Sequence, residues 1–186
     1  MSINSMGNQM NYQIVISGVG GQGVLFVTRL LAQACMDDNK RVLTSETHGM
    51  AQRGGTVISH LKVGSFKSPL IRPGNADLLV ALKEENYPQH KGFLRSGGKA
   101  IVNTASTQVE GADLTPVDAD AMASRDENLH STNLYMLGAA LGAVDVCSLE
   151  RIKEQIVKVF SAKSDTVRAK ALLALETGYN HISKEL

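Results

Sequence analysis

The sequence predicts an α/β fold in which helices cover a mostly parallel sheet. Apolar, β-branched runs alternate with helical segments, beginning with a strand at residues 14–17 and a helix at residues 22–38. The run at residues 76–82 is almost unbroken in its apolar character, which is typical of a strand buried on both faces of a parallel sheet. Because strands that alternate with helices form sheets covered on both sides, we expect a Rossmann-like three-layer sandwich.

Further strands follow from shorter patterns. Residues 56–63 alternate between apolar and polar side chains, which predicts an antiparallel strand or a strand at the sheet edge. The remaining expected strands are residues 41–45 and 99–103, with 114–117 as a candidate for one more.

Helices are expected in the second half of the chain at residues 132–144, 149–160 and 164–178. Ser148 is the predicted N-cap of the second of these, and Gly178 is predicted just past the end of the third. One face of the second helix should carry Ile152, Ile156, Val159 and Phe160. Residues 83–94 read as a helical or turn-like crossover interrupted at Pro88.

Length and composition indicate one ordinary globular domain. The chain has 186 residues, of which 43% are hydrophobic and 20% charged, and its net charge is +1. We expect a single domain at residues 12–186 and a flexible N-terminal tail at residues 1–11. The small net charge does not favour nucleic acid or membrane surfaces as partners. No apolar run approaches the ~20 residues of a membrane span and no signal peptide is visible, so we expect a cytoplasmic protein.

Two cysteines, Cys35 and Cys147, lie far apart in the sequence. Neither belongs to a C-x-x-C pair, so the chain cannot ligate an iron–sulfur cluster or a structural zinc by itself, and we expect no metal site. We expect both to be reduced thiols that are packed or half-exposed.

A glycine-rich turn follows the first strand directly. Residues 18–23 read Gly-Val-Gly-Gly-Gln-Gly and fit the pattern G-x-G-x-x-G between a strand and a helix. Such glycines allow a tight turn and a close approach of a ligand, and the N-terminus of the following helix favours a negative charge. The turn predicts a site for an anionic ligand, with glycines that serve only packing as the alternative.

The polar segment after the second strand is the second candidate. Residues 46–55 read Glu-Thr-His-Gly-Met-Ala-Gln-Arg-Gly-Gly. Because ligands of doubly wound sheets lie beyond the carboxyl ends of strands, this segment and the glycine turn should share one sheet edge. His48 and Arg53 could each contact an anion, Arg53 through two parallel hydrogen bonds. A solvated surface loop is the alternative.

Other polar residues give weaker signals. Glu46 ends the second strand, where nicotinamide-dinucleotide enzymes place the acid that binds ribose hydroxyls. His60 shares its strand with Ser59, and only one of the two can face the ligand side. No role is assigned to the loop aspartates and isolated histidines, namely Asp113, Asp118, Asp120, His90, His130 and His181.

Three stretches together resemble one enzyme family. They are G-V-G-G-Q-G-V at residues 18–24, S-E-T-H-G-M-A-Q-R-G-G at residues 45–55 and S-P-L-I at residues 68–71. They resemble the gamma-type subunit of 2-oxoacid:ferredoxin oxidoreductases, and among these the small beta subunit of indolepyruvate ferredoxin oxidoreductase. The likeness covers residues 12–178, and the H-G-M-A-Q-R-G-G block is far more specific than the glycine turn alone.

The resemblance implies a multi-subunit enzyme that oxidatively decarboxylates a 2-oxoacid with coenzyme A, giving acyl-CoA, CO2 and reduced ferredoxin. Thiamine diphosphate and iron–sulfur clusters would be bound by partner subunits, so the chain alone would hold no cofactor and be inactive. A homodimer of the isolated chain is left open. The residues that match the two family motifs, expected near coenzyme A or the thiamine subunit, are Gly18, Gly20, Gly21, Gln22, Gly23, His48, Gly49, Gln52, Arg53, Gly54 and Gly55.

Two other functions remain open on the sequence alone. One is a free-standing NAD(P)-binding oxidoreductase or sensor that uses Glu46, and the other is a purely structural interface module. The sequence does not select the 2-oxoacid either, since indolepyruvate, pyruvate and branched-chain acids all fit the resemblance.

Overall fold

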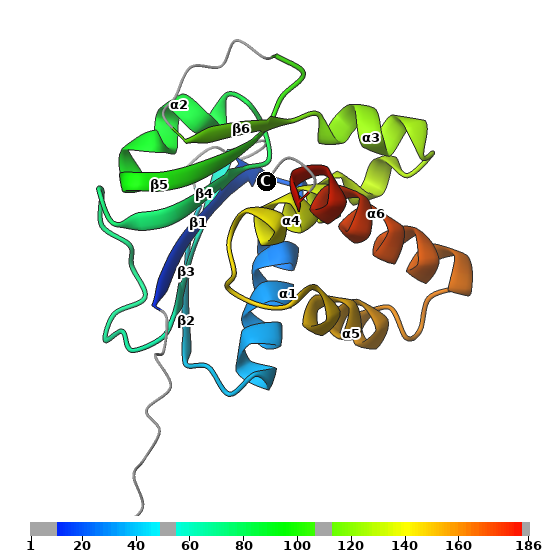
Figure 1. Cartoon of the computed structure of the whole chain (residues 1–186), viewed down its shortest axis with the longest axis horizontal. Helices are drawn as coiled ribbons and strands as arrows, with labels where there is room; N and C mark the ends of the chain where they lie inside the picture. The colour runs from blue at the N-terminus through cyan, green and yellow to red at the C-terminus, as the bar shows by residue number, and fades with distance from the viewer. Residues whose placement is uncertain (1–10, 49–54, 107–112, 184–186) are drawn as a thin grey trace, which may run out of the picture.

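A computed structural model of the chain describes residues 11–48, 55–106 and 113–183 (Figure 1). Its centre is a six-stranded sheet in the spatial order β2-β3-β1-β4-β5-β6. The predicted N-terminal tail lies outside the described residues except for Asn11. The strands are β1 (Tyr12–Val19), β2 (Val42–His48), β3 (Thr56–Val63), β4 (Ala76–Ala81), β5 (Leu94–Asn103) and β6 (Leu114–Val117).

The sheet is mostly parallel, as predicted. β1 pairs in parallel with β4, β4 with β5, and β5 with β6, whereas β3 runs antiparallel to both of its neighbours, β1 and β2. The antiparallel alternative predicted for residues 56–63 is therefore confirmed. The edge alternative is wrong, because β2 pairs with the outer side of β3.

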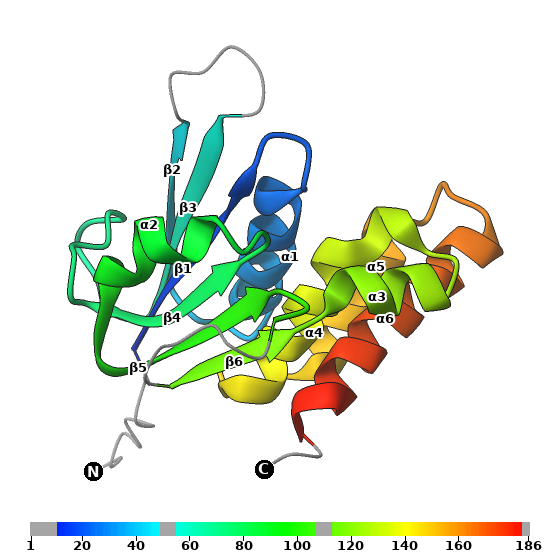
Figure 2. The same ribbon diagram turned by 90° about the horizontal axis from the view of Figure 1, so that it is seen from above.

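Helices cover the two faces of the sheet unequally. Figure 2 shows α2 on one side of the sheet and α1, α4, α5 and α6 on the other. The helices are α1 (Val24–Asp37), α2 (Asn86–His90), α3 (Ala119–Arg125), α4 (Thr132–Ala143), α5 (Leu149–Val159) and α6 (Asp165–Ser183), with short 3-10 helices η1 (Lys91–Phe93) and η2 (Leu129–Ser131). Among the described helices none is long and apolar enough to cross a membrane.

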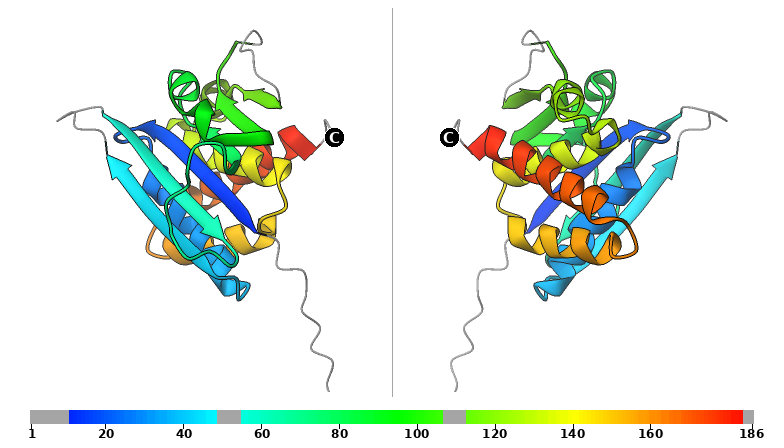
Figure 3. Two further views of the ribbon diagram at one scale, coloured as in Figure 1. Left: turned by 90° about the vertical axis from the view of Figure 1, so that its left-hand side faces the viewer. Right: turned by 90° about the vertical axis from the view of Figure 1, so that its right-hand side faces the viewer.

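The apolar core is divided by the sheet, because successive side chains of a strand point to opposite faces. On the face covered by α1, α4, α5 and α6, Ile14 and Ile16 of β1 pack with the residues of α1 and α4. On the opposite face, which α2 covers, Val15 of β1 packs with Tyr87 of α2 and Ile71 of the loop before β4. The predicted three layers are thus present, with a short helix and a loop as the third (Figure 3).

The crossover after β4 contains a helix where the sequence predicts an interruption. Pro88 is the third residue of α2, a position in the first turn where a backbone N–H would have no partner within the helix. The proline therefore does not break the helix.

The last helix does not end at Gly178, as the sequence predicts. α6 continues to Ser183, and Gly178 lies where α6 crosses α4. A β-carbon at Gly178 would lie 1.9 Å from the carbonyl oxygen of Tyr135, and one at Gly138 would lie 2.1 Å from that of Leu175. These two glycines are needed for the close approach of two helix backbones, so the prediction that Gly178 ends the helix is wrong.

The preceding helix, α5, begins as predicted. The Ser148 side chain accepts a hydrogen bond from the backbone N–H of Arg151 at 3.3 Å, which is the geometry of an N-cap. Ile152 and Ile156 are buried, but Val159 is 56% exposed. The apolar face predicted for this helix is therefore narrower than expected. Phe160, the residue after the helix, packs with its ring edge-to-face against Phe26 of α1.

Candidate functional site

The glycine loop, residues 18–23, joins β1 to α1 and depends on the absence of side chains. A β-carbon at Gly18 would lie 2.8 Å from a methyl carbon of Val24. Gly21 and Gly23 have φ angles of 93° and 80°, in the left-handed region that other residues rarely adopt. Gly23 is the N-cap of α1 and has no side chain to offer, so the first N–H groups of α1 are left for another partner.

Gln22 fixes the shape of this loop. Its Oε1 accepts from the backbone N–H of Val19 at 2.8 Å, and its Nε2 donates to the carbonyl oxygen of Leu82 at 3.2 Å. Asn103 of β5 donates to the same carbonyl oxygen at 3.1 Å. Because both polar atoms of the Gln22 amide are bound to backbone, Gln22 holds the loop against the ends of β1 and β4. The second N–H of its amide group is left as a donor for a ligand.

The N-terminus of α4 meets the N-terminus of α1 at this loop. A β-carbon at Gly23 would lie 2.1 Å from Nδ2 of Asn133, the second residue of α4. Ser131, the N-cap of α4, donates its hydroxyl to Oδ1 of Asn128 at 2.8 Å and does not cap the helix. Two helices thus point uncapped N-termini at one place, and both macrodipoles favour a negative charge there.

A cavity of about 260 Å³ opens between these two helix ends. Its lining includes Gly21 and Gln22 of the glycine loop, Thr132 and Asn133 of α4, and the polar side chains of Asp120 and His130. A cavity of this volume can hold a phosphate group together with the few atoms bonded to it. The backbone amides supply hydrogen-bond donors and Asp120 supplies an acceptor, so the cavity can bind an anion that also carries a hydroxyl or amine.

A larger hollow of about 440 Å³ lies beside this cavity and shares Leu129, His130 and Asn133 with it. Its other walls include Phe26 and Phe160, whose ring centroids are 5.9 Å apart in an edge-to-face arrangement. It contains none of the glycine loop, so the smaller cavity is the candidate site.

The segment after β2 joins the glycine loop, as predicted. The backbone N–H of Gly20 donates to the carbonyl oxygen of Gly55 at 3.1 Å. His48 is the last residue of β2 and pairs with Val57, but its side chain is not described. The other predicted residues of this segment lie outside the described part of the chain; they are Gly49, Gln52, Arg53 and Gly54.

Comparisons with known proteins identify the family. Residues 13–181 match the model of the pyruvate ferredoxin/flavodoxin oxidoreductase family. The chain is 31% identical over 194 residues to the indolepyruvate oxidoreductase subunit IorB of Archaeoglobus fulgidus, covering 92% of this chain and 95% of that protein. The chain belongs to the pyruvate ferredoxin/flavodoxin oxidoreductase family. The resemblance noted from the sequence is thereby confirmed.

Solved structures place the chain among the gamma-type subunits of this family. The pyruvate oxidoreductase subunit PORC of Thermotoga maritima superposes with a TM-score of 0.79 at 25% identity, over 91% of this chain and 96% of that one. The 2-oxoglutarate:ferredoxin oxidoreductase of Magnetococcus marinus shares the fold, with a TM-score of 0.81 at 23% identity over 95% of this chain and 31% of that one. The gamma-type fold is therefore a separate subunit in one relative and part of a longer chain in the other.

The strand order of this family member separates Glu46 from the glycine loop. In the nicotinamide-dinucleotide fold, the strand that carries the ribose-binding acid lies next to β1. Here β3 lies between them: Glu46 pairs with Ser59, and Ser59 pairs with Ile16. Two strand spacings amount to about 10 Å, so Glu46 does not occupy the position that binds ribose in NAD enzymes.

Two features of the site region were not found from the sequence. Asn133 is a polar residue in the first turn of an otherwise apolar helix, a signal that was available in the sequence. Ser17 and His90 are both buried, and Ser17 Oγ lies 2.8 Å from His90 Nδ1. No sequence pattern links these two residues, because α2 reaches β1 only through the tertiary fold.

The buried histidines predict a loss of stability in acid. Burial lowers the pKa of both His60 and His90, and nearby Lys62 lowers that of His60 further. Because an unfolded histidine has a pKa of about 6.5, the unfolded chain binds more protons below that pH. We expect the free energy of unfolding to fall below about pH 6.5, by at most ~1.4 kcal/mol per pH unit for each histidine.

Urea unfolding at a series of pH values measures this slope. His90→Gln should reduce it, whereas His130→Gln, at an exposed position, should leave it unchanged. If His60→Gln and His90→Gln both kept the wild-type slope, other groups would control the acid sensitivity.

Proposed function

We propose that the chain serves, as a gamma-type subunit, in a multi-subunit enzyme that oxidatively decarboxylates a 2-oxoacid with coenzyme A. The products are acyl-CoA, CO2 and reduced ferredoxin. Within this subunit the cavity at the glycine loop binds a phosphate group of coenzyme A. The supporting observation is the meeting of two uncapped helix N-termini, of α1 and α4, at a glycine loop that belongs to the family motif.

Partner subunits supply the redox chemistry in this proposal. The chain has two cysteines, so it cannot provide the four thiolates of an iron–sulfur cluster. Thiamine diphosphate and the clusters would be held by the other subunits, from which electrons pass to ferredoxin. This chain would bind and orient coenzyme A toward them, as a cytoplasmic hetero-oligomer.

Indolepyruvate is the first substrate to test, with pyruvate and branched-chain 2-oxoacids as the others. The relative from Archaeoglobus fulgidus is named for indolepyruvate and the one from Thermotoga maritima for pyruvate. The Magnetococcus marinus enzyme was solved with coenzyme A and succinyl-CoA bound, which supports coenzyme A as the acyl acceptor.

Titration of the full chain, alone and purified with its partner subunits, tests the proposal. We expect binding of coenzyme A, much weaker binding of pantetheine, which lacks the phosphates, and no tight binding of NAD(H) or NADP(H). Equal affinity for pantetheine and coenzyme A would mean that the cavity does not hold phosphate. Tight nicotinamide binding without any partner would instead favour the free-standing oxidoreductase.

Arg53 provides a prediction that depends on the family motif alone. Arg53→Ala removes a charged group and should leave the free energy of unfolding of the isolated chain within ~0.5 kcal/mol of wild type. In the assembled enzyme it should weaken coenzyme A use or subunit docking by about 1.5–3 kcal/mol, the range for a lost charged hydrogen bond. Arg53→Lys should restore part of this, because an ammonium cannot form the same paired bonds. Full turnover and assembly in Arg53→Ala would show that the arginine is not part of the site.

A further inference from the structure

The hollow of about 440 Å³ beside the glycine-loop cavity is large enough for a ligand group of its own. It falls within the range of roughly 300–1,000 Å³ that is typical of small-molecule pockets. Leu129, His130 and Asn133 line both spaces, so one ligand can extend from the cavity into the hollow. Because Phe26 and Phe160 form part of its wall, we call it the aromatic hollow.

The wall of the aromatic hollow favours a flat, apolar ring. Phe26 belongs to α1 and Phe160 follows α5, and the buried side chains of Leu134 and Ala171 lie in the same wall. The planes of the two phenylalanine rings meet at 86°. An aromatic ring that stacks on one of them therefore meets the other edge-on, and both arrangements are favourable.

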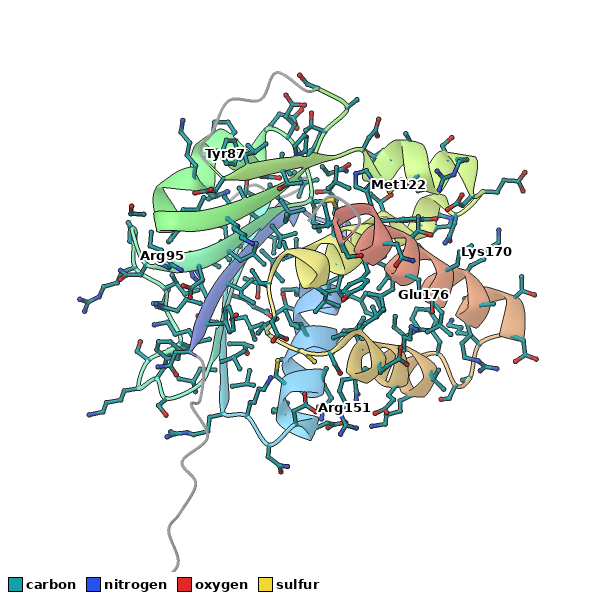
Figure 4. The ribbon with its side chains drawn as sticks, in the orientation of Figure 1. Tyr87, Arg95, Met122, Arg151, Lys170 and Glu176 are labelled. Atoms are coloured by element: carbon teal, nitrogen blue, oxygen red, sulfur yellow. The ribbon has the colours of Figure 1, made fainter. Side chains whose placement is uncertain are left out.

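Hydrogen bonds hold the segment before α4 against α6, so the aromatic hollow is formed without a ligand. The side chain of buried Asn128 donates from Nδ2 to the carbonyl oxygen of Lys170 at 2.9 Å, and its Oδ1 accepts from the Ser131 hydroxyl at 2.8 Å. Lys170 of α6, labelled in Figure 4, donates from Nζ to the carbonyl oxygen of Glu127 at 2.7 Å. A preformed pocket loses little free energy to ordering when a ligand binds.

The charged residues of the aromatic hollow do not favour a second phosphate. Glu127 and Lys170 both line it, and their opposite charges offset each other. The carboxylate of Glu127 accepts hydrogen bonds and the ammonium group of Lys170 donates them. A neutral ring that carries both donors and acceptors at its edge therefore fits this wall better than an anion does.

We propose that the aromatic hollow binds the adenine ring of coenzyme A, an inference that rests on the proposed function. With a phosphate of coenzyme A at the N-termini of α1 and α4, the adenine is the flat aromatic group that can enter the adjoining space. The thiol at the other end of coenzyme A has to reach thiamine diphosphate, which the partner subunits hold in the proposed function. The base is therefore the end of the molecule that stays in this subunit.

Binding of coenzyme A is compared with binding of phosphopantetheine, which has a phosphate but no base, in the full chain with its partner subunits. Phe26→Leu and Phe160→Leu each remove a ring and keep an apolar side chain. At least one should weaken coenzyme A binding about 5-fold or more, the lower end for loss of a base–aromatic stack, and leave phosphopantetheine binding unchanged. Val159→Ala, an exposed neighbour outside the hollow, is the control and should change neither.

Etheno-coenzyme A, whose modified base is fluorescent, gives a readout that needs no substitution. In the wild-type complex its bound base should be shielded from quenching by acrylamide. A base that stays open to acrylamide, unchanged coenzyme A binding in both phenylalanine variants, or equal losses for coenzyme A and phosphopantetheine would overturn the inference and leave the phosphate site standing. If the wild-type complex bound neither ligand, the phosphate site of the proposed function would fail as well.

Discussion

Gly178→Ala is expected to destabilise the chain by about 1–3 kcal/mol, the usual cost of overpacking a close-packed core. The new β-carbon would lie 1.9 Å from the carbonyl oxygen of Tyr135, a backbone atom that cannot rotate away. α4 and α6 would have to separate, and their shared core around Leu134, Ala174 and Leu175 would open. Alanine gains up to ~1 kcal/mol over glycine in helix propensity, but overpacking of this kind costs more than that gain. Urea unfolding measures the net change.

Gly92→Ala is the matched control. Gly92 lies in η1, has an ordinary backbone conformation, and has no atom within 4 Å of the position of an added β-carbon. We expect its unfolding free energy to stay within ~0.5 kcal/mol of wild type. If Gly178→Ala were as mild as Gly92→Ala, the close crossing of α4 and α6 would not be a determinant of stability.

Asn133→Asp is expected to weaken coenzyme A binding by about 2–3 kcal/mol, or roughly 30- to 150-fold. The substitution changes little volume but places a carboxylate where the N-termini of α1 and α4 meet, and this carboxylate would repel a phosphate. The same change should not destabilise the subunit. An acid in the first turn of a helix contributes ~0.3–1 kcal/mol to its stability. Opposite effects on binding and on stability would separate a ligand role from a structural one.

Asn180→Asp serves as the control for charge, since Asn180 is an exposed residue of α6 outside the cavity lining. It should leave the apparent affinity for coenzyme A unchanged, both in the full chain and in the assembled enzyme. Unchanged coenzyme A affinity in Asn133→Asp would place the phosphate site elsewhere, even if the enzyme proved to be a 2-oxoacid oxidoreductase.

Elements whose signal is local could be predicted from the sequence. The buried run that forms β4 and the alternation that forms β3 each reflect the burial of their own side chains. The Ser148 cap depends on atoms three residues apart, so it was visible in the sequence as well. The predictions that were wrong involve contacts between elements. The role of Gly178 depends on α4, whose backbone lies against α6 at that residue.

In the candidate site, too, some features follow from local sequence and others from contacts between distant segments. The sequence by itself determined that a glycine loop follows β1 and that the family motif contains it, because the required backbone conformations and the motif are properties of short segments. Only the tertiary structure decided that β3 separates Glu46 from this loop and that α4 brings Asn133 to it. Strand order and helix packing join segments far apart in the chain, and no local pattern of side chains specifies which of them will meet.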